Sequence, residues 1–190
     1  MRKSKQEAAA TRQRIVKAAA AAFRKDGIAG TGLSDLMAAA GLTHGGFYRH
    51  FDSKDQVVAE ACIAAAESLI DQLAASASGK SPQRGLKTIV ETYLSAAHRD
   101  QPVDGCPLAA LGSEMARGDE RTRAAATQAL LKLVGVIASQ FGKTRPDVAR
   151  RRALVAAATM IGALTMSRIV TDSELSAGIL REAEKQLLNS

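Results

Sequence analysis

Apolar residues recur at the spacing of one helix face along most of the chain, and this periodicity constrains the fold more than any other feature. In the first such segment Ile15, Ala18, Ala19, Ala22 and Phe23 fall at i, i+3, i+4, i+7 and i+8. No stretch alternates apolar and polar residues in the manner of a strand. Aromatic residues make up only 3% of the chain and Trp is absent, so the core must consist of small and aliphatic side chains. This composition favours close-packed helices, and we predict an all-α fold.

Start and stop signals divide the 190 residues into about nine helices. The strongest start signal is the pair Ser53 and Gln56, which has the spacing of a capping box. Gly27 and Gly41 are predicted to end helices in the left-handed conformation, which costs glycine little. The predicted helices span residues 5–26, 31–40, 43–51, 53–77, 82–97, 107–118, 119–141, 144–170 and 173–189, with a loop at 98–105 between the fifth and the sixth.

Positive charge is concentrated at the N-terminal end. Residues 1–55 carry ten Lys and Arg against five acidic residues, so they hold +5 of the total charge of +7. A basic segment on a nearly balanced body indicates a polyanionic partner at that end, although a solubilising surface would have the same composition. The basic arm of Arg2, Lys3 and Lys5 would add non-specific attraction to such a partner.

Residues 31–51 have the arrangement of a helix-turn-helix: a short helix, a turn at Gly41 and a second short helix. The second helix contains Gly45 and Gly46, each of which weakens a helix by about 0.5–1 kcal/mol relative to Ala. The pair falls on the first turn, which in a recognition helix meets the base edges. We predict that the backbone there approaches a DNA duplex closely. The alternative is that the glycines mark a loop.

Polar residues around the glycine pair are the candidate DNA contacts. The hydroxyls of Thr31 and Ser34, at the start of the first short helix, could bind a phosphate, and Thr31 is also the predicted N-cap. Phe47 and Phe51 are four residues apart and are predicted to be core. The complete set of predicted DNA-binding residues is Thr31, Ser34, Thr43, His44, Gly45, Gly46, Tyr48, Arg49, His50 and Lys54.

The segment from Thr11 to Ala61 resembles the DNA-binding domain of the TetR family of transcriptional regulators. The resemblance is most specific where F-Y leads into H-F and then S-K, after A-G-L-T. It implies an all-α homodimer, a two-fold operator and a C-terminal domain that binds an inducer. Carried over by position, Thr43, Tyr48, His50 and Lys54 match the DNA-contact pattern of the family. Met37 departs from it, because the family usually has a small Ala at this helix crossing.

The remaining residues are predicted to bind a ligand and to dimerise. The segment GCPLAALGSE (Gly105 to Glu114) resembles one found in one branch of such regulators. Cys106 precedes Pro107 at a predicted helix N-cap, so it is either a sensing thiolate or a small buried residue, whereas Cys62 is predicted to be core. Candidate pocket residues, for which core packing is the alternative, are Tyr93, His98, Cys106, Leu111, Met115, Phe141 and Met160.

The last two helices are predicted to form a four-helix bundle across a two-fold axis. Small and flexible side chains on the eighth helix would let backbones approach closely, and a broad apolar stripe on the ninth would complete the interface. The eighth-helix residues are Ala153, Ala156, Ala157, Gly162, Ala163 and Met166.

Several classes of function are not supported by the sequence. Two cysteines do not make a disulfide framework, and the basic N-terminus has no apolar segment behind it, so a cytoplasmic protein is expected. The longest uncharged stretch, Ala153 to Ser167, is too short to span a bilayer. The three His residues are scattered without a metal-site spacing, and no phosphate loop or nucleophile elbow occurs. We therefore expect no metal, cofactor, membrane partner or enzymatic activity.

The prediction is a helix-turn-helix DNA-binding domain at residues 1–55 and a ligand-binding and dimerisation domain at 56–190. The protein would be a homodimeric, sequence-specific transcriptional regulator, a repressor released from a palindromic operator in double-stranded DNA by a small-molecule inducer. Two alternatives stay open: a sequence-independent DNA-architectural protein, and a helical bundle that binds a small molecule and has an incidentally basic N-terminus.

Overall fold

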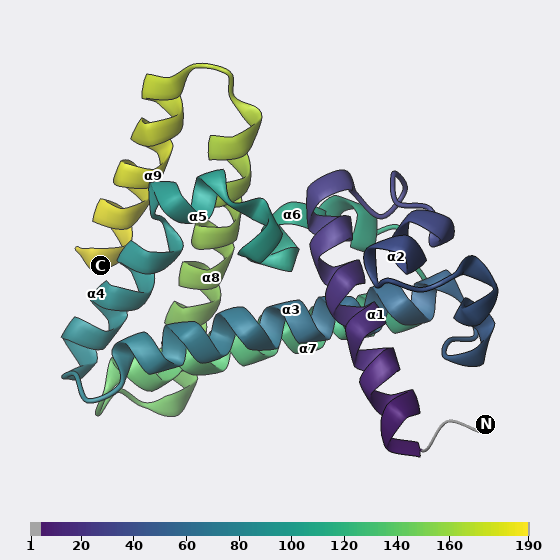
Figure 1. The fold of residues 1–190 in the computed structure, drawn as a ribbon. Coiled ribbons are helices and arrows are strands. Elements are labelled where there is room, and N and C mark those ends of the chain that lie inside the picture. Colours follow the sequence, from purple (N-terminus) through teal and green to yellow (C-terminus); the bar gives the residue numbers. More distant parts are fainter. Residues whose placement is uncertain (1–4, 190) are drawn as a thin grey trace.

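The computed structural model describes residues 5–189, and this part of the chain is entirely helical, as predicted (Figure 1). It contains nine α-helices and three short 3-10 helices. The α-helices are α1 (Lys5–Asp26), α2 (Leu33–Ala39), α3 (Lys54–Ala77), α4 (Pro82–Tyr93), α5 (Ala96–Asp100), α6 (Pro107–Met115), α7 (Glu120–Ala138), α8 (Pro146–Ile169) and α9 (Ser173–Leu188). The 3-10 helices are η1 (His44–Arg49), η2 (Pro102–Asp104) and η3 (Ser139–Phe141).

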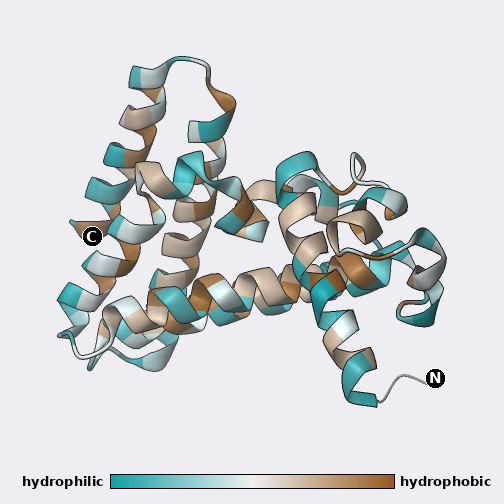
Figure 2. Ribbon diagram, viewed as in Figure 1, coloured by the Kyte–Doolittle hydropathy of each residue, from teal (hydrophilic) through white to brown (hydrophobic). Residues whose placement is uncertain are grey.

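Helices α3 and α7 lie side by side and form the long axis of the molecule (Figure 1). Helix α1 crosses α3 at one end of this axis, and α2 packs against α1 there, with η1 against α2. Helices α8 and α9 form an antiparallel pair at the other end, with α8 packed on α7 and α9. Figure 2 shows apolar residues along the faces where these helices meet. One continuous core therefore links the helix-turn-helix end to the α8–α9 end.

The start signals of α3 and the two turn glycines are confirmed. The Ser53 hydroxyl accepts a hydrogen bond from the Gln56 backbone N–H at 3.2 Å. The Gln56 side chain accepts in turn from the backbone N–H of Asp52 at 2.8 Å, one residue earlier than in a standard capping box. Gly27 and Gly41 have φ angles of 81° and 68°, in the region that favours glycine.

Two boundary predictions are wrong. The predicted helix over 82–97 ends at Tyr93, and a new helix, α5, starts after Ser95, whose hydroxyl accepts from the His98 N–H at 3.1 Å. The predicted loop over 98–105 is therefore largely helical. Thr31 is not a helix cap: Gly32 holds the N-cap position of α2, and the Thr31 hydroxyl donates to the Gly27 carbonyl at 2.7 Å.

The third predicted helix also differs from expectation, because η1 is a 3-10 helix that ends at Arg49. Thr43 occupies its N-cap position without a side-chain cap. Two adjacent glycines remove most of the helix propensity of a six-residue segment, so a tighter and shorter turn competes with the α-helix.

Most of the small α8 residues assigned to a dimer contact instead face the interior of the chain. Their side chains are buried in the contacts of α8 with α7 and α9, and their small size lets these helices pack closely. The exposed apolar residues of α8 are Leu154, Val155, Met166 and Ile169. The buried residues to which this correction applies are Ala153, Ala156, Ala157 and Ala163.

The segments Glu120–Phe141 and Pro146–Ile169 are long and apolar enough to cross a membrane, by length and composition alone. The uncharged stretch Ala153 to Ser167 is only part of the second segment, which also contains charged residues. This is weak evidence for membrane insertion, since core helices of soluble proteins have the same composition. Here α7 and α8 pack on each other, and on α3 and α9 respectively.

Candidate nucleic-acid interface

The helix-turn-helix has its own set of buried aromatic and aliphatic side chains. Phe47 and Phe51 are buried, as predicted, with ring centroids 5.7 Å apart. They share the core with Ile15 of α1 and Leu36 of α2. Met37 is also fully buried, and its Cε atom would lie 3.5 Å from a Cβ atom placed on Gly46. The larger residue at the helix crossing therefore packs where Gly46 leaves room for it.

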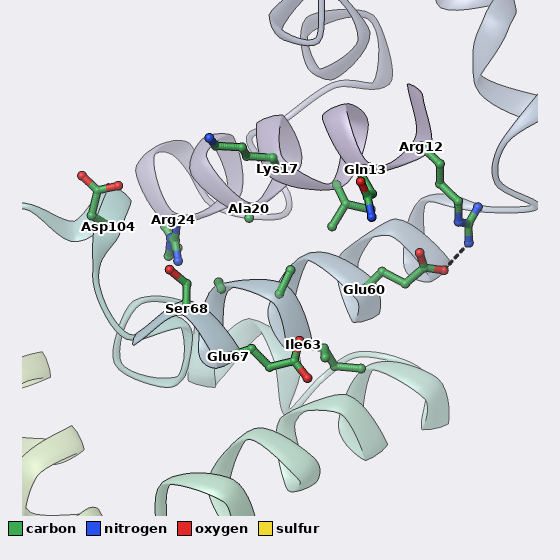
Figure 3. A pocket seen from close by; sticks show the side chains of 13 residues that line it. Arg12, Gln13, Lys17, Ala20, Arg24, Glu60, Ile63, Glu67, Ser68 and Asp104 are labelled. Atoms are coloured by element: carbon green, nitrogen blue, oxygen red, sulfur yellow. Dashed lines mark hydrogen bonds and ion pairs between the residues drawn. The ribbon is translucent and has the colours of Figure 1, made fainter. Parts of the chain in front are cut away.

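Two arginines of α1 hold the ends of the helix-turn-helix in place. The Arg12 guanidinium lies 4.1 Å from the Phe51 ring centroid and donates to the His50 carbonyl. It also forms an ion pair with Glu60 of α3 (Figure 3). Arg14 donates to the Ala40 carbonyl at 2.7 Å. Neither contact could be predicted from local sequence patterns, because the partners lie 26 to 48 residues away along the chain.

Six of the predicted DNA-binding residues are exposed, and we call them the reading surface. Ser34 of α2 and His44 of η1 contact each other across this surface, with 3.3 Å between the Ser34 hydroxyl and Nδ1 of His44. Tyr48 is 67% exposed. Its ring packs edge to face against Phe47, with ring centroids 5.2 Å apart, so one side of the phenol contacts the core while the side chain stays accessible from outside. The reading surface consists of Ser34, Thr43, His44, Gly45, Tyr48 and Arg49.

The fold itself does not require glycine at position 45. A Cβ atom placed on Gly45 would meet no atom within 4 Å, and the residue does not have a positive φ. Neither close internal packing nor a left-handed backbone therefore explains this residue. An exposed stretch of bare backbone on the reading surface is what close approach by an external molecule requires.

The other predicted DNA contacts lie beside the reading surface. Thr31 is buried, and its hydroxyl is already donated within the chain. The Lys54 ammonium donates to the Ile28 carbonyl at 2.5 Å, which ties the start of α3 to the α1–α2 loop. Gly46 and His50 are partly buried. Arg2 and Lys3 of the basic arm lie outside the described residues.

The predicted pocket residues do not line one common cavity. Phe141, Met115 and Cys106 border three different cavities. His98 has both ring nitrogens engaged: Nδ1 lies 2.7 Å from the Tyr93 carbonyl, and Nε2 accepts from the Cys106 backbone N–H at 2.9 Å. This pattern requires a neutral ring protonated at Nδ1, and burial lowers the pKa of His98 in agreement with it. Tyr93, Leu111 and Met160 are buried core residues.

The two thiols are buried and protonated. Burial raises the pKa of Cys106, although the residue holds the N-cap position of α6, and this disfavours the thiolate that a sensing role needs. Burial also raises the pKa of Cys62 to about 12. The structure thus supports the interpretation of Cys106 as a small buried residue.

Neither thiol should react quickly with a disulfide reagent in the folded protein. At pH 8 we expect the reagent DTNB to label Cys62 and Cys106 slowly, because the reactive thiolate is scarce and access is blocked. Both should react at once in guanidinium chloride. Rapid labelling of native protein, assigned to Cys106 by a Cys62→Ser control, would restore the sensing hypothesis.

A cavity of about 620 Å³ lies between α1 and α3, on the side of the helix-turn-helix core (Figure 3). Its charged side chains balance, with three cations and three carboxylates, and Arg12 and Glu60 form an ion pair. The cavity therefore has no net preference for an anion or a cation. Its charged residues are Arg12, Lys17, Arg24, Glu60, Glu67 and Asp104.

Comparison with known proteins identifies both parts of the chain. Residues 15–61 match the family described as bacterial regulatory proteins, tetR family. Residues 82–186 match the C-terminal domain described as transcriptional regulator LmrA/YxaF-like. The second match covers more than half of the chain.

Individual relatives agree with this. The transcriptional regulator TtgR of Pseudomonas putida is 45% identical over 58 residues, which are 30% of this chain and 28% of TtgR. AcrR of Shigella flexneri is 37% identical over 93 residues, 49% of this chain and 43% of AcrR. The matched parts thus span less than half of these relatives.

Solved structures match over nearly the full length. A TetR transcriptional regulator from Chloroflexus aurantiacus has a TM-score of 0.78 and 32% identity, covering 97% of this chain and 95% of that one. A TetR-family regulator from Cytophaga hutchinsonii has a TM-score of 0.81 and 26% identity, covering 98% and 97%. With an N-terminal helix-turn-helix, an all-α C-terminal domain and these relatives, the chain belongs to the TetR family of bacterial transcriptional regulators.

Proposed function

We propose that the protein is a homodimeric repressor that binds a palindromic operator through its reading surface and leaves it when a small-molecule inducer binds. The observation that carries the proposal is Gly45, a bare and exposed backbone position that the fold itself does not need. In a recognition helix this position faces the floor of the major groove. His44 and Thr43 beside it can donate to or accept from base edges, and Tyr48 and Arg49 can bind phosphates.

A two-fold dimer would place two reading surfaces in successive major grooves, about 34 Å apart or slightly more. Exposed apolar residues on α8 and α9 support dimerisation through these two helices, at the opposite end of the molecule from the reading surface (Figure 1). An inducer would act by binding more tightly to a form of the dimer whose reading surfaces have the wrong spacing. A repressor of this kind works in the cytoplasm, beside the chromosome.

Selection of bound duplexes from a random pool, at stated salt concentration, tests the proposal. We expect enrichment of an inverted repeat, with an affinity that falls steeply as salt rises because phosphate contacts release counterions. Binding without any preferred sequence would favour the architectural alternative. No duplex binding at low ionic strength would favour the small-molecule-binding bundle and would contradict the proposal.

A further inference from the structure

A second cavity, which we call the junction cavity, lies where the helix-turn-helix end meets the C-terminal domain. Its volume is about 520 Å³, within the usual range of about 300–1,000 Å³ for small-molecule sites. It is bordered by the last turn of α1, by η2, α6 and α8. Two arginines and a mainly apolar wall line it, including Arg24, Leu108, Ala109, Met166, Arg168 and Ile169.

Both arginines lie against the same residue, Gly105. Nη1 of Arg24 donates to the Gly105 carbonyl at 3.1 Å. Nη2 of Arg168 would lie 3.1 Å from a Cβ atom placed on Gly105. The guanidinium groups of Arg24, from α1, and Arg168, from α8, therefore both lie next to Gly105, and both residues border the junction cavity.

Neither cation forms an ion pair with a carboxylate in the described part of the chain. Arg168 donates to the carbonyls of His98 and Arg99, which are neutral acceptors, and its Nη1 atom is buried without a partner. Nε of Arg24 is likewise buried and unpartnered. Two carboxylates act on these cations at longer range, Asp104 on Arg24 and Asp100 on Arg168, and neither borders the junction cavity.

Half-buried cations without an ion pair are uncommon, because buried charges are usually paired directly with an opposite charge. Burial lowers the pKa of Arg24 and of Arg168, which shows that the surroundings disfavour their charge. The hydrogen bonds of Arg168 to the end of α5 explain part of its position. They do not explain why two cations and no carboxylate border one cavity.

We propose that the junction cavity binds a small organic anion, a carboxylate with an apolar body, whose charged end lies between Arg24 and Arg168. Planar guanidinium groups bind carboxylates with paired, charge-assisted hydrogen bonds. Leu108, Ala109 and Ala110 of α6 would contact the apolar body. As a regulatory site the cavity rests on the proposed function, because Arg24 belongs to α1, which supports the reading surface.

Isothermal titration calorimetry on the DNA-free protein tests the site. The probes are octanoate, uncharged octanamide of the same shape, and inorganic phosphate, which lacks an apolar body. We expect octanoate to bind, octanamide to bind at least about tenfold more weakly, and phosphate to bind more weakly than octanoate. Equal binding of octanoate and octanamide, tighter binding of phosphate, or no octanoate binding would overturn the inference.

Variants then locate the site. Arg24→Gln and Arg168→Gln should each weaken octanoate binding about tenfold or more, whereas the exposed control Arg117→Gln should bind as the parent does. Because the Gln variants also lose internal hydrogen bonds, Arg24→Lys and Arg168→Lys are the second pair: they retain the charge but not the planar group, so they should bind octanoate more weakly than the parent and more tightly than the Gln variants, with folding checked by circular dichroism. Unchanged octanoate binding in both Gln variants would place the anion elsewhere and contradict the proposal.

The outcome can be separated from that of the proposed function. If octanoate does not bind while a selected operator does, only the junction site is wrong. If octanoate binds with the expected dependence on the arginines but no duplex is selected, the site stands and the regulatory function fails. When both bind, octanoate should lower operator affinity by about 5-fold or more, and the operator should lower octanoate affinity by the same factor.

Discussion

Gly45→Leu should abolish tight operator binding while leaving the folded protein intact. The substituted side chain would project from the reading surface into open space, so it meets nothing inside the molecule. On a duplex it would occupy the gap between backbone and groove floor and push the neighbouring polar residues out of hydrogen-bonding range. Because contacts to several bases would be lost together, we expect affinity to fall about 100-fold or more, roughly 2.7 kcal/mol.

The folding stability of the Gly45→Leu variant should be unchanged or slightly higher than that of the parent. Leu has a higher helix propensity than Gly by about 0.8 kcal/mol, so the melting temperature should be equal or slightly higher. Fluorescence anisotropy on the selected operator and thermal melting by circular dichroism measure the two effects. Gly135→Leu is the matched control, since Gly135 is also exposed and has open space around its Cβ position, but lies on α7. Operator binding of the Gly45 variant at parental strength would contradict the groove-facing assignment.

Local sequence signals predicted the elements whose determinants lie within a few residues of each other. The cap at Ser53, the left-handed Gly27 and Gly41, and the buried pair Phe47 and Phe51 all depend on spacings of two to four residues. The same kind of signal predicted the polar residues of the reading surface, six of which are exposed. It could not decide between an α-helix and the 3-10 helix of η1, because glycine pairs make the energies of the two forms similar.

What the sequence could not supply depends on contacts between distant segments. Arg12 and Arg14 hold the helix-turn-helix through partners on other elements, and Arg24 meets Gly105 across 81 residues. Periodicity also failed on α8, where apolar residues occur all around the helix. A sequence pattern cannot say which of two apolar faces is turned inward, so buried Ala residues were assigned to the dimer contact and the outward Val155 and Ile169 were overlooked.

The double variant Val155→Arg, Ile169→Arg should be monomeric and should bind the operator only weakly. Val155 is 65% exposed and Ile169 64%, and they lie on one stripe of α8 that passes through Gly162, where a Cβ atom would meet nothing within 4 Å. Apolar side chains around a bare backbone position suit close packing against a second copy of α8. In a two-fold contact each substitution introduces one arginine from each protomer. These cations would be buried beside each other or without an opposite charge, which makes dimerisation less favourable by several kcal/mol.

Sedimentation equilibrium should give a mass near twice 19.9 kDa for the parent and near 19.9 kDa for the variant at micromolar concentration. Operator affinity should fall by about 10²–10⁴, because two reading surfaces on one dimer bind the two half-sites with the benefit of a high effective concentration. Leu131→Arg is the control, since it charges an exposed apolar residue of α7 off this stripe. A dimeric double variant would show that the chain associates through another surface, and monomeric control protein would show that any added charge is enough.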